Sequence, residues 1–204
     1  MGNSKIRIFS GVAFSGFILI LLFSFSQPAA AQNENVLFIV APENFRDEEL
    51  FVPKEILEKA GKKVEVASTK TGQISGMLKG NAVAGKLIEN SKPEDYSALV
   101  IVGGTGSKEF LWESGQLRNL VVSFAKLNRP LAAICLSPVV LGKAGVLKGK
   151  KATVWKDDET LAELKKAGAA YEEKPVVSDG MIITGNGPEA AKAFAEAILK
   201  ALKK

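Results

Sequence analysis

Short apolar runs alternate with amphipathic segments along most of the chain, and this alternation restricts the possible folds more than any other feature. The runs at Asn35–Val40, Ala98–Val102 and Leu131–Ile134 are almost entirely apolar, as expected for strands that are covered on both faces. Segments between them, such as Glu113–Leu127, repeat apolar residues with helical spacing. Strands that alternate with helices build a parallel sheet with helices on both faces. The sequence therefore predicts an α/β fold with a mostly parallel sheet.

The remaining segments continue this pattern, with one irregular stretch. Because proline is tolerated only in the first turn of a helix, the helix that contains Pro53 and closes at Gly61 should begin close to Glu49. Residues 68–90 are rich in Gly, Lys and Asn, which favours a small hairpin. Further strands are predicted at Lys63–Ala67, Lys151–Val154, Val176–Ser178 and Met181–Thr184, and further helices at Pro138–Ala144, from Asp157 or Asp158 to Gly168, and from Gly187-Pro188 to the C-terminus.

Residues 1–31 differ in composition from the rest and are predicted to lie outside the folded domain. Lys5 and Arg7 form a basic start without acids, an apolar stretch follows, and small residues lead up to Ala31. This pattern is typical of a secretory signal peptide that is cleaved near Ala31. It predicts an exported protein, periplasmic or secreted, with a single domain over residues 32–204. The alternative is an uncleaved N-terminal anchor, which would be the expected link to a membrane.

The composition limits the chemistry, because the chain has no histidine and a single cysteine, Cys135. Ser-His-Asp triads, Cys-His dyads and histidine-ligated zinc are therefore excluded, as are an intramolecular disulfide and a CxxC pair. The net charge of the full chain is +5, and the excess is scattered among acids, so no nucleic-acid interface is expected. We expect neither a metal nor a cofactor. Any chemistry must come from carboxylates, lysines, hydroxyls, backbone amides or Cys135.

Cys135 stands where a predicted buried strand turns into a helix, at the edge of the sheet where sites form in such folds. A side chain at this kind of turn points up from the sheet, as in a nucleophile elbow. The N-terminus of the following helix favours a thiolate and should lower the pKa of the cysteine. The alternative is that Cys135 is a small buried hydrophobic residue.

The loop Gly103-Gly104-Thr105-Gly106 follows another predicted strand. Its spacing fits neither the GxGxxG nucleotide motif nor a P-loop. Its glycines would allow backbone N–H groups to face a bound oxygen, as in an oxyanion hole, and a plain turn is the alternative.

The third loop follows Val40 and carries several acids. Acids at a helix N-terminus often do no more than interact with the helix dipole. A carboxyl buried against Cys135 would differ, because burial would raise its pKa and its protonated form could hydrogen-bond a thiolate. The residues alone do not choose among the candidates, which are Glu43, Asp47, Glu48 and Glu49.

The segment from Ala132 to Thr153, which begins Ala-Ala-Ile-Cys-Leu-Ser-Pro, resembles the signature of the ThiJ/PfpI superfamily. Other segments resemble the family in the same order, so the resemblance covers nearly the whole chain after residue 31. These segments are Val36–Val40, Phe45–Pro53, Val100–Gly104 and Asp179–Pro188. The resemblance implies a three-layer flavodoxin-like sandwich, related to class I glutamine amidotransferases, that usually forms a homodimer.

The resemblance also implies roles for particular residues. Cys135 corresponds to the reactive cysteine of the family, and Glu49, four residues before Pro53, corresponds to the carboxyl that hydrogen-bonds it. The backbone amides of Gly104 and Leu136 correspond to the oxyanion-type donors, and Gly103 belongs to the same glycine loop.

Three positions depart from the family pattern. Leu136 stands where protease-type members carry a histidine, and this disfavours peptidase activity. Ser137 replaces a glycine, a change that would narrow or polarise the turn. Trp155 stands where many deglycase-type members place a histidine at the rim of the pocket, and an indole cannot transfer protons. All three residues are predicted to help form the substrate pocket.

Two hypotheses of function follow. In the first, the protein is a glyoxalase- or deglycase-like enzyme, in which the Cys135 thiolate adds to a small reactive aldehyde and Glu49 moves the proton. The amides of Gly104 and Leu136 would then bind the oxyanion. In the second, the protein is a non-enzymatic stress protein, in which an oxidant converts Cys135 to a sulfenate or sulfinate.

Overall fold

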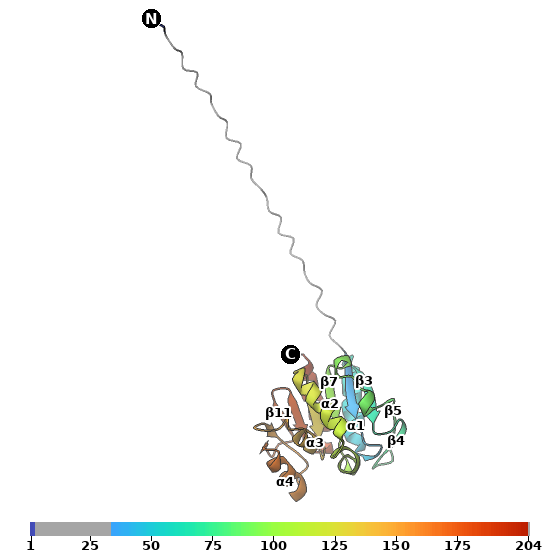
Figure 1. The fold of residues 1–204 in the computed structure, drawn as a ribbon. Helices are drawn as coiled ribbons and strands as arrows, with labels where there is room; N and C mark the ends of the chain where they lie inside the picture. The colour runs from blue at the N-terminus through green and yellow to red at the C-terminus, as the bar shows by residue number, and fades with distance from the viewer. Residues whose placement is uncertain (3–33, 204) are drawn as a thin grey trace. The chain divides into compact units, whose positions relative to one another are not determined.

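The apolar runs predicted to be buried strands lie in one seven-stranded sheet with the order β11-β12-β8-β7-β1-β3-β6 (Figure 1). The strands β1 (Asn35–Ile39), β7 (Ala98–Ile101) and β8 (Leu131–Ile134) form its parallel centre. All other pairs in this sheet are also parallel, except that β11 runs antiparallel to β12. The outer strands are β3 (Lys63–Ser68), β6 (Lys86–Leu87), β12 (Ile182–Gly185) and β11 (Val176–Asp179). The predicted mostly parallel sheet is confirmed.

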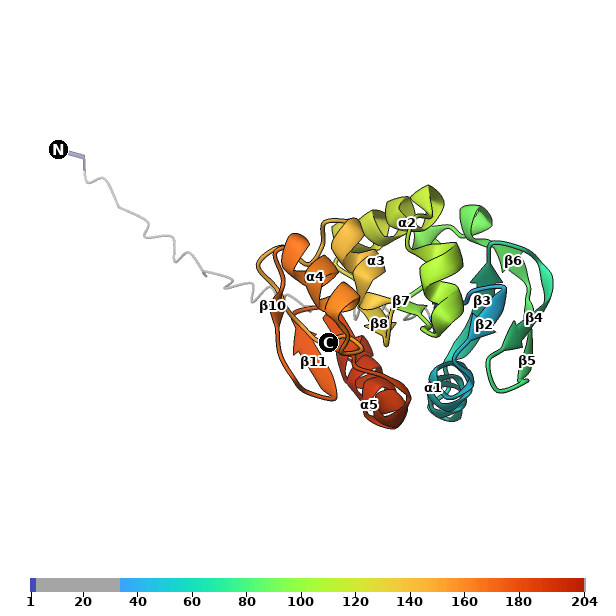
Figure 2. The ribbon, with the colours of Figure 1, turned by 90° about the horizontal axis from the view of Figure 1, so that it is seen from below.

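Helices cover both faces of the sheet (Figure 2). One face carries α1 (Asp47–Lys59) and α5 (Ala191–Leu202), and the other carries α2 (Gly115–Lys126) and α3 (Pro138–Lys143), with α4 (Asp158–Lys166) packed against α3. Strand side chains alternate between the two faces. Leu37 of β1 therefore packs in the core under α2 and α3, whereas Phe38 packs in the core under α1 and α5.

This computed structural model describes residues 34–203 and the first two residues of the chain. The predicted signal segment at residues 1–31 lies almost wholly outside this range, so its cleavage stays a prediction. Within the described part, every helix is too short or too polar to cross a bilayer.

Several predicted element boundaries differ from the structure. The final helix was predicted from Gly187-Pro188, but Pro188–Ala190 forms a 3₁₀ turn and α5 begins at Ala191. The helix α1 begins at Asp47, two residues before the predicted start, so that Pro53 lies inside it. Because proline has no N–H group, the backbone carbonyl of Glu49 receives no hydrogen bond from residue 53. The packing of Leu50 and Leu57 in the core nevertheless keeps the helix continuous. Of the predicted strand Lys151–Val154, only β9 (Lys151–Ala152) forms, and it pairs with β10 (Ala170–Tyr171) outside the main sheet.

The hairpin predicted within residues 68–90 is confirmed and joins a small second sheet. The strands β4 (Gly72–Gly76) and β5 (Asn81–Ala84) are antiparallel, and β4 also pairs with β2 (Glu43–Phe45), a strand that was not predicted. The buried carboxylate of Asp47 accepts hydrogen bonds from the turn between β4 and β5, at 2.8 Å from Leu78 N and 2.7 Å from Gly80 N. This connection fixes the turn next to the start of α1.

Short helical turns complete the described part of the chain. They are the 3₁₀ turns η1 (Ile88–Asn90), η2 (Pro93–Asp95) and η4 (Pro188–Ala190), and the π-helical turn η3 (Ser107–Leu111). The last of these follows the glycine loop directly; its Ser107 and Leu111 side chains are buried, whereas Lys108 and Glu109 are exposed.

Candidate active site

Cys135 forms a sharp turn between β8 and α3. Its φ angle is 63°, in the left-handed region that costs a non-glycine residue about 1–2 kcal/mol. Two backbone hydrogen bonds of 2.9 Å fix this conformation, one from Cys135 N to Gly185 O and one from Trp155 N to Cys135 O. The predicted elbow geometry is therefore present, and its strain is balanced by contacts with two neighbouring segments.

Buried polar side chains support the elbow from below. The Ser137 hydroxyl donates to Val102 O at 2.7 Å and accepts from the Ser107 hydroxyl at 2.7 Å. The Trp112 indole donates to Leu136 O at 2.9 Å. Ser137 was predicted to contact substrate, but its side chain is fully buried and points into this network, because the carbonyl of Val102 needs a donor. Ser107 and Trp112 were not predicted from the sequence.

Glu49 is the acid that the fold brings to Cys135. Its side chain is fully buried, and Oε2 accepts a hydrogen bond of 3.1 Å from Gly103 N. The other oxygen, Oε1, is buried and has no hydrogen-bond partner among the described residues. The other three candidate acids have different partners: Asp47 bonds the hairpin turn, Glu48 pairs with Arg46, and Glu43 pairs with Lys70.

Gly103 allows the thiol and the carboxyl to approach each other. A Cβ atom at this position would lie 2.4 Å from Glu49 Oε2, 2.5 Å from Cys135 Cβ and 2.7 Å from Ile134 O. Atoms cannot approach so closely, so any side chain here would force apart the two functional groups. Gly103 was predicted to belong to the site, and the structure gives a steric reason: only glycine leaves room for Glu49 and Cys135 to lie side by side.

Burial dominates the electrostatics of the pair. It raises the pKa of Glu49 to about 8, and the neighbouring Cys135 thiol and the N–H of Gly103 offset only part of this. Burial also raises the pKa of Cys135 to about 12, with the charge of Glu49 adding to the rise and the amides of Gly104 and Leu136 opposing it. The expected lowering of the cysteine pKa by the helix terminus was therefore wrong in direction. At neutral pH both groups are mostly protonated, and Glu49 ionises first.

The thiol opens into a pocket of about 240 Å³. Its lining is mostly apolar and includes Leu136 and Trp155, as predicted, together with residues that the sequence analysis missed, notably Arg46 and Met77. Trp155 is 47% exposed and forms part of the rim, where its ring packs over Gly187. A Cβ on Gly187 would lie 2.9 Å from the indole ring, so glycine at this position leaves the space that the ring occupies.

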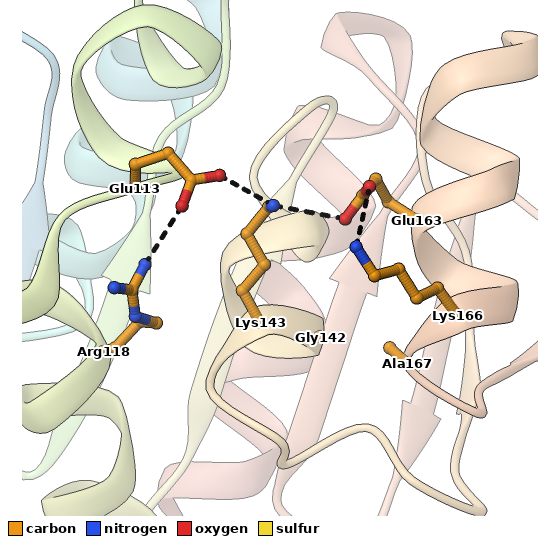
Figure 3. A pocket seen from close by; sticks show the side chains of 7 residues that line it. All are labelled: Glu113, Arg118, Gly142, Lys143, Glu163, Lys166 and Ala167. Atoms are coloured by element: carbon orange, nitrogen blue, oxygen red, sulfur yellow. Dashed lines mark hydrogen bonds and ion pairs between the residues drawn. The ribbon is translucent and has the colours of Figure 1, made fainter.

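A second pocket, of about 360 Å³, lies between α2, α3 and α4 and is lined by charged side chains (Figure 3). Lys143 pairs with Glu113 at 2.8 Å and with Glu163 at 3.3 Å, and Arg118 pairs with Glu113 at 3.5 Å. These pairs lower the pKa of Glu113 and raise that of Lys143, so both stay charged. Carboxylates and lysines that are held charged in mutual ion pairs are weaker candidates for catalysis than the Cys135 thiol and Glu49, and we therefore place the candidate site at the smaller pocket.

The residues at the site do not suit a metal. The described part of the chain contains no group of three or more Cys, Asp or Glu side chains placed to coordinate an ion. One thiol and one carboxyl, both protonated at neutral pH, are a poor ligand set because metals bind the deprotonated forms.

A family model described as the DJ-1/PfpI family matches residues 34–201. The chain belongs to the DJ-1/PfpI family. An uncharacterized protein of Methanocaldococcus jannaschii is 51% identical over 173 residues, covering 85% of this chain and 84% of that one. A deglycase of Pyrococcus horikoshii is 33% identical over 175 residues, covering 82% and 99%.

Solved structures give the same assignment. A ThiJ/PfpI domain protein of Brachyspira murdochii is 32% identical with a TM-score of 0.80, covering 84% of this chain and 98% of that one. DJ-1beta of Drosophila melanogaster is 28% identical with a TM-score of 0.73, covering 84% and 92%. The resemblance drawn from the cysteine segment and the predicted three-layer fold are both confirmed.

Proposed function

We propose that the protein is an enzyme that converts small α-oxoaldehydes, such as methylglyoxal, into hydroxy acids without a cofactor. The observation that carries this proposal is the buried pair beside the pocket: the Cys135 thiol lies against Glu49, whose Oε1 has no hydrogen-bond partner within residues 34–203. An ionisable carboxyl with a free oxygen, a raised pKa and a neighbouring nucleophile is the arrangement that general acid–base catalysis needs. The relative named as a deglycase gives the proposal further support.

The proposed reaction begins when the Cys135 sulfur adds to the aldehyde carbon and Glu49 accepts the thiol proton, giving a hemithioacetal. Glu49 passes this proton to the new alkoxide, removes the proton of the former aldehyde carbon, and returns it to the neighbouring ketone carbon, while the hydroxyl proton moves to the former ketone oxygen. This transfer produces a thioester, and water then releases the hydroxy acid and restores the thiol. The aldehyde carbon is oxidised and the ketone carbon is reduced, so one water is consumed and no external oxidant is required.

In the proposed reaction, the backbone amides of Gly104 and Leu136 bind the oxyanion. Both donate toward the Cys135 sulfur and lower its pKa, which means that they stabilise negative charge at the reacting centre. The indole of Trp155 at the rim contributes apolar surface and takes no part in proton transfer. Peptidase activity is disfavoured, because no imidazole is present to activate the thiol against an amide.

The alternative, a redox-responsive stress protein, is supported by the same two amides, which could also bind the oxygens of a sulfinate. It ranks second because the thiolate is the form that peroxide oxidises, and burial raises the pKa of Cys135 to about 12. A thiol that stays protonated reacts slowly with peroxide, whereas a neighbouring base can still activate it against an aldehyde.

Lactate formation from methylglyoxal tests the proposal. The wild-type protein should form lactate, and the Cys135→Ser variant should not. If the two proteins give equal rates, the enzyme is ruled out. Mass spectrometry after graded peroxide tests the alternative, which requires complete addition of two oxygen atoms to Cys135 at low peroxide.

We also propose, from the sequence, that the protein is exported after cleavage near Ala31 and that it forms a homodimer. Exposed apolar side chains near the pocket, at Phe51, Met77 and Leu78, offer a surface for a second copy. The intact mass of exported protein should correspond to a chain that begins at Gln32, and light scattering should give twice the mass of that chain. A full-length chain or a monomer would contradict the respective proposal.

A further inference from the structure

Arg46 brings the only charged side chain to the described lining of the Cys135 pocket. It precedes α1, and its backbone N–H donates to Gly103 O at 3.1 Å, so its position is tied to the glycine loop. The remaining lining consists of apolar side chains, glycine, the Thr105 hydroxyl and the thiol. A single cation in a mostly apolar pocket gives that pocket a preference for anions.

The guanidinium of Arg46 is held in a defined orientation and keeps donors available. Its Nε and Nη2 atoms donate to the two oxygens of Glu48, at 2.8 Å and 3.1 Å. A guanidinium has five N–H donors in a planar fork, and this side-on pair uses two of them. The end-on fork formed by Nη1 and Nη2 remains, and this fork matches the two oxygens of a carboxylate.

The cation is also close enough to the reacting groups to act on the same small molecule. The guanidinium interacts electrostatically with both Glu49 and Cys135. Its side chain is 29% exposed, so it is partly shielded from water, and a charge-assisted hydrogen bond is stronger there than at an open surface. A molecule that fills the pocket of about 240 Å³ can therefore place one end on the sulfur and the other on Arg46.

We propose that Arg46 determines specificity and selects α-oxoaldehydes that carry a carboxylate. This inference rests on the proposed function and names its substrate class. The aldehyde carbon lies at Cys135 while the carboxylate receives two hydrogen bonds from the end-on fork of Arg46, with Glu48 holding the guanidinium in plane. For dioxovalerate, the same internal oxidation and reduction consumes one water and gives hydroxyglutarate.

Alkylation of Cys135 tests anion recognition without any turnover. The Cys135 thiolate displaces iodide from both iodoacetate and iodoacetamide, and only iodoacetate carries a carboxylate. We expect Arg46→Gln to lower the ratio of the iodoacetate rate to the iodoacetamide rate by about tenfold, the value of a charge-assisted hydrogen bond of ~1.4 kcal/mol. The matched control is Arg118→Gln, which removes an arginine paired with a glutamate in the other pocket and should leave the ratio unchanged. The iodoacetamide rate alone reports whether the pocket of each variant is intact.

Turnover of dioxovalerate and methylglyoxal by the same proteins completes the test. Wild type should have a higher kcat/KM for dioxovalerate than for methylglyoxal, and the ratio of the two values should fall toward one in Arg46→Gln. An alkylation ratio that Arg46→Gln leaves unchanged overturns the inference, even if both aldehydes are converted. A ratio that falls while wild type converts neither aldehyde overturns the proposed function and leaves anion recognition by Arg46 in place.

Discussion

The two pockets contrast in how they treat charge. In the larger one, between α2, α3 and α4, Lys143 lies between Glu113 and Glu163, and every carboxylate faces a cation (Figure 3). Beside the smaller one, behind the Cys135 thiol, Glu49 is fully buried, and one of its oxygens has no hydrogen-bond partner among the described residues. Paired surface charges stabilise a fold weakly and stay ionised, whereas a buried unpaired carboxyl costs stability and changes its pKa.

Under the proposed function the smaller pocket is the active one, so pocket size alone would not have located it. The ion pairs of the larger pocket keep ordinary charge states, so they have no reason to exchange protons. The Cys135–Glu49 pair is unfavourable for stability and is held in place by the elbow and the glycine loop. Residues that destabilise a fold and yet are firmly positioned are typical of active sites.

The largest expected effect comes from removing the nucleophile. Cys135→Ala should lower the rate of lactate formation by about a thousandfold or more, because no other group can form the covalent adduct. Lys143→Gln, in the larger pocket, is the control and should keep the rate within about twofold. If both variants lost the same fraction of the lactate-forming rate, the assignment of catalysis to the smaller pocket would be contradicted.

The second largest effect on the rate is expected from removing the carboxyl group of Glu49. Glu49→Gln should lower the rate by about a hundredfold or more, since it removes the group that accepts the proton. In wild type the rate should rise with pH as Glu49 ionises around pH 8, and the variant should lack this rise. Measuring the rate as a function of pH for both proteins checks the prediction. If the rate of the variant rose with pH in the same way, the rise would come from a group other than Glu49.

A side chain at Gly103 should damage both stability and activity. In Gly103→Ala the new Cβ would collide with Glu49, Cys135 and a backbone carbonyl, which should cost about 1–3 kcal/mol in the free energy of unfolding and move the thiol away from the acid. Gly115→Ala is the matched control, because a Cβ there meets nothing within 4 Å and the position begins a helix. Urea unfolding compares the two, and a Gly103→Ala protein as stable as wild type would contradict the packing at the pair.

The raised pKa of Glu49 should appear in the pH dependence of stability. The folded protein holds this proton more tightly than the unfolded chain, whose reference pKa is 4.5, so the contribution of Glu49 to stability falls as pH rises from about 4.5 to about 8. The slope is at most about 1.4 kcal/mol per pH unit. Urea unfolding of wild type and Glu49→Gln across this range should show the variant gaining relative stability as pH rises. A constant difference would show that the carboxyl has an ordinary pKa.

The smallest effect belongs to the ion pairs. Lys143→Met should lower stability only slightly, and added salt should reduce the difference, because Glu113 is 77% exposed and its pair with Lys143 is screened. Thermal unfolding at low and high salt measures this. A large loss that does not depend on salt would show that the larger pocket has a structural role that its ion pairs do not explain.

The sequence predicted the central sheet well and the second sheet incompletely. Short uninterrupted apolar runs such as Leu131–Ile134 are typical of strands that are buried on both faces, so their length and composition identified them. The strand β2 was missed because Glu43–Phe45 is short and mostly polar, and it is defined by its pairing with β4. The strand predicted over Lys151–Val154 was too long, because only its first two residues pair with another strand.

At the site, the family resemblance identified Cys135, Glu49 and the glycine loop, which local patterns alone left undecided. The pKa of Cys135 was predicted in the wrong direction, because the helix-terminus rule is local and burial by the surrounding fold outweighs it. Arg46 was missed for a similar reason: its entry into the pocket depends on how α1 packs beside the elbow. Spacing in a sequence carries no information on such contacts.

The pH dependence of Cys135 alkylation by iodoacetamide, in wild type and in Glu49→Gln, tests the coupled pair most directly. The wild-type thiol should ionise well above the ordinary value of about 8.5, because burial and the Glu49 charge both oppose the thiolate. In Glu49→Gln the charge is gone, and the thiol pKa should fall. A wild-type pKa below about 8.5, or identical profiles for the two proteins, would contradict the coupling of Cys135 and Glu49.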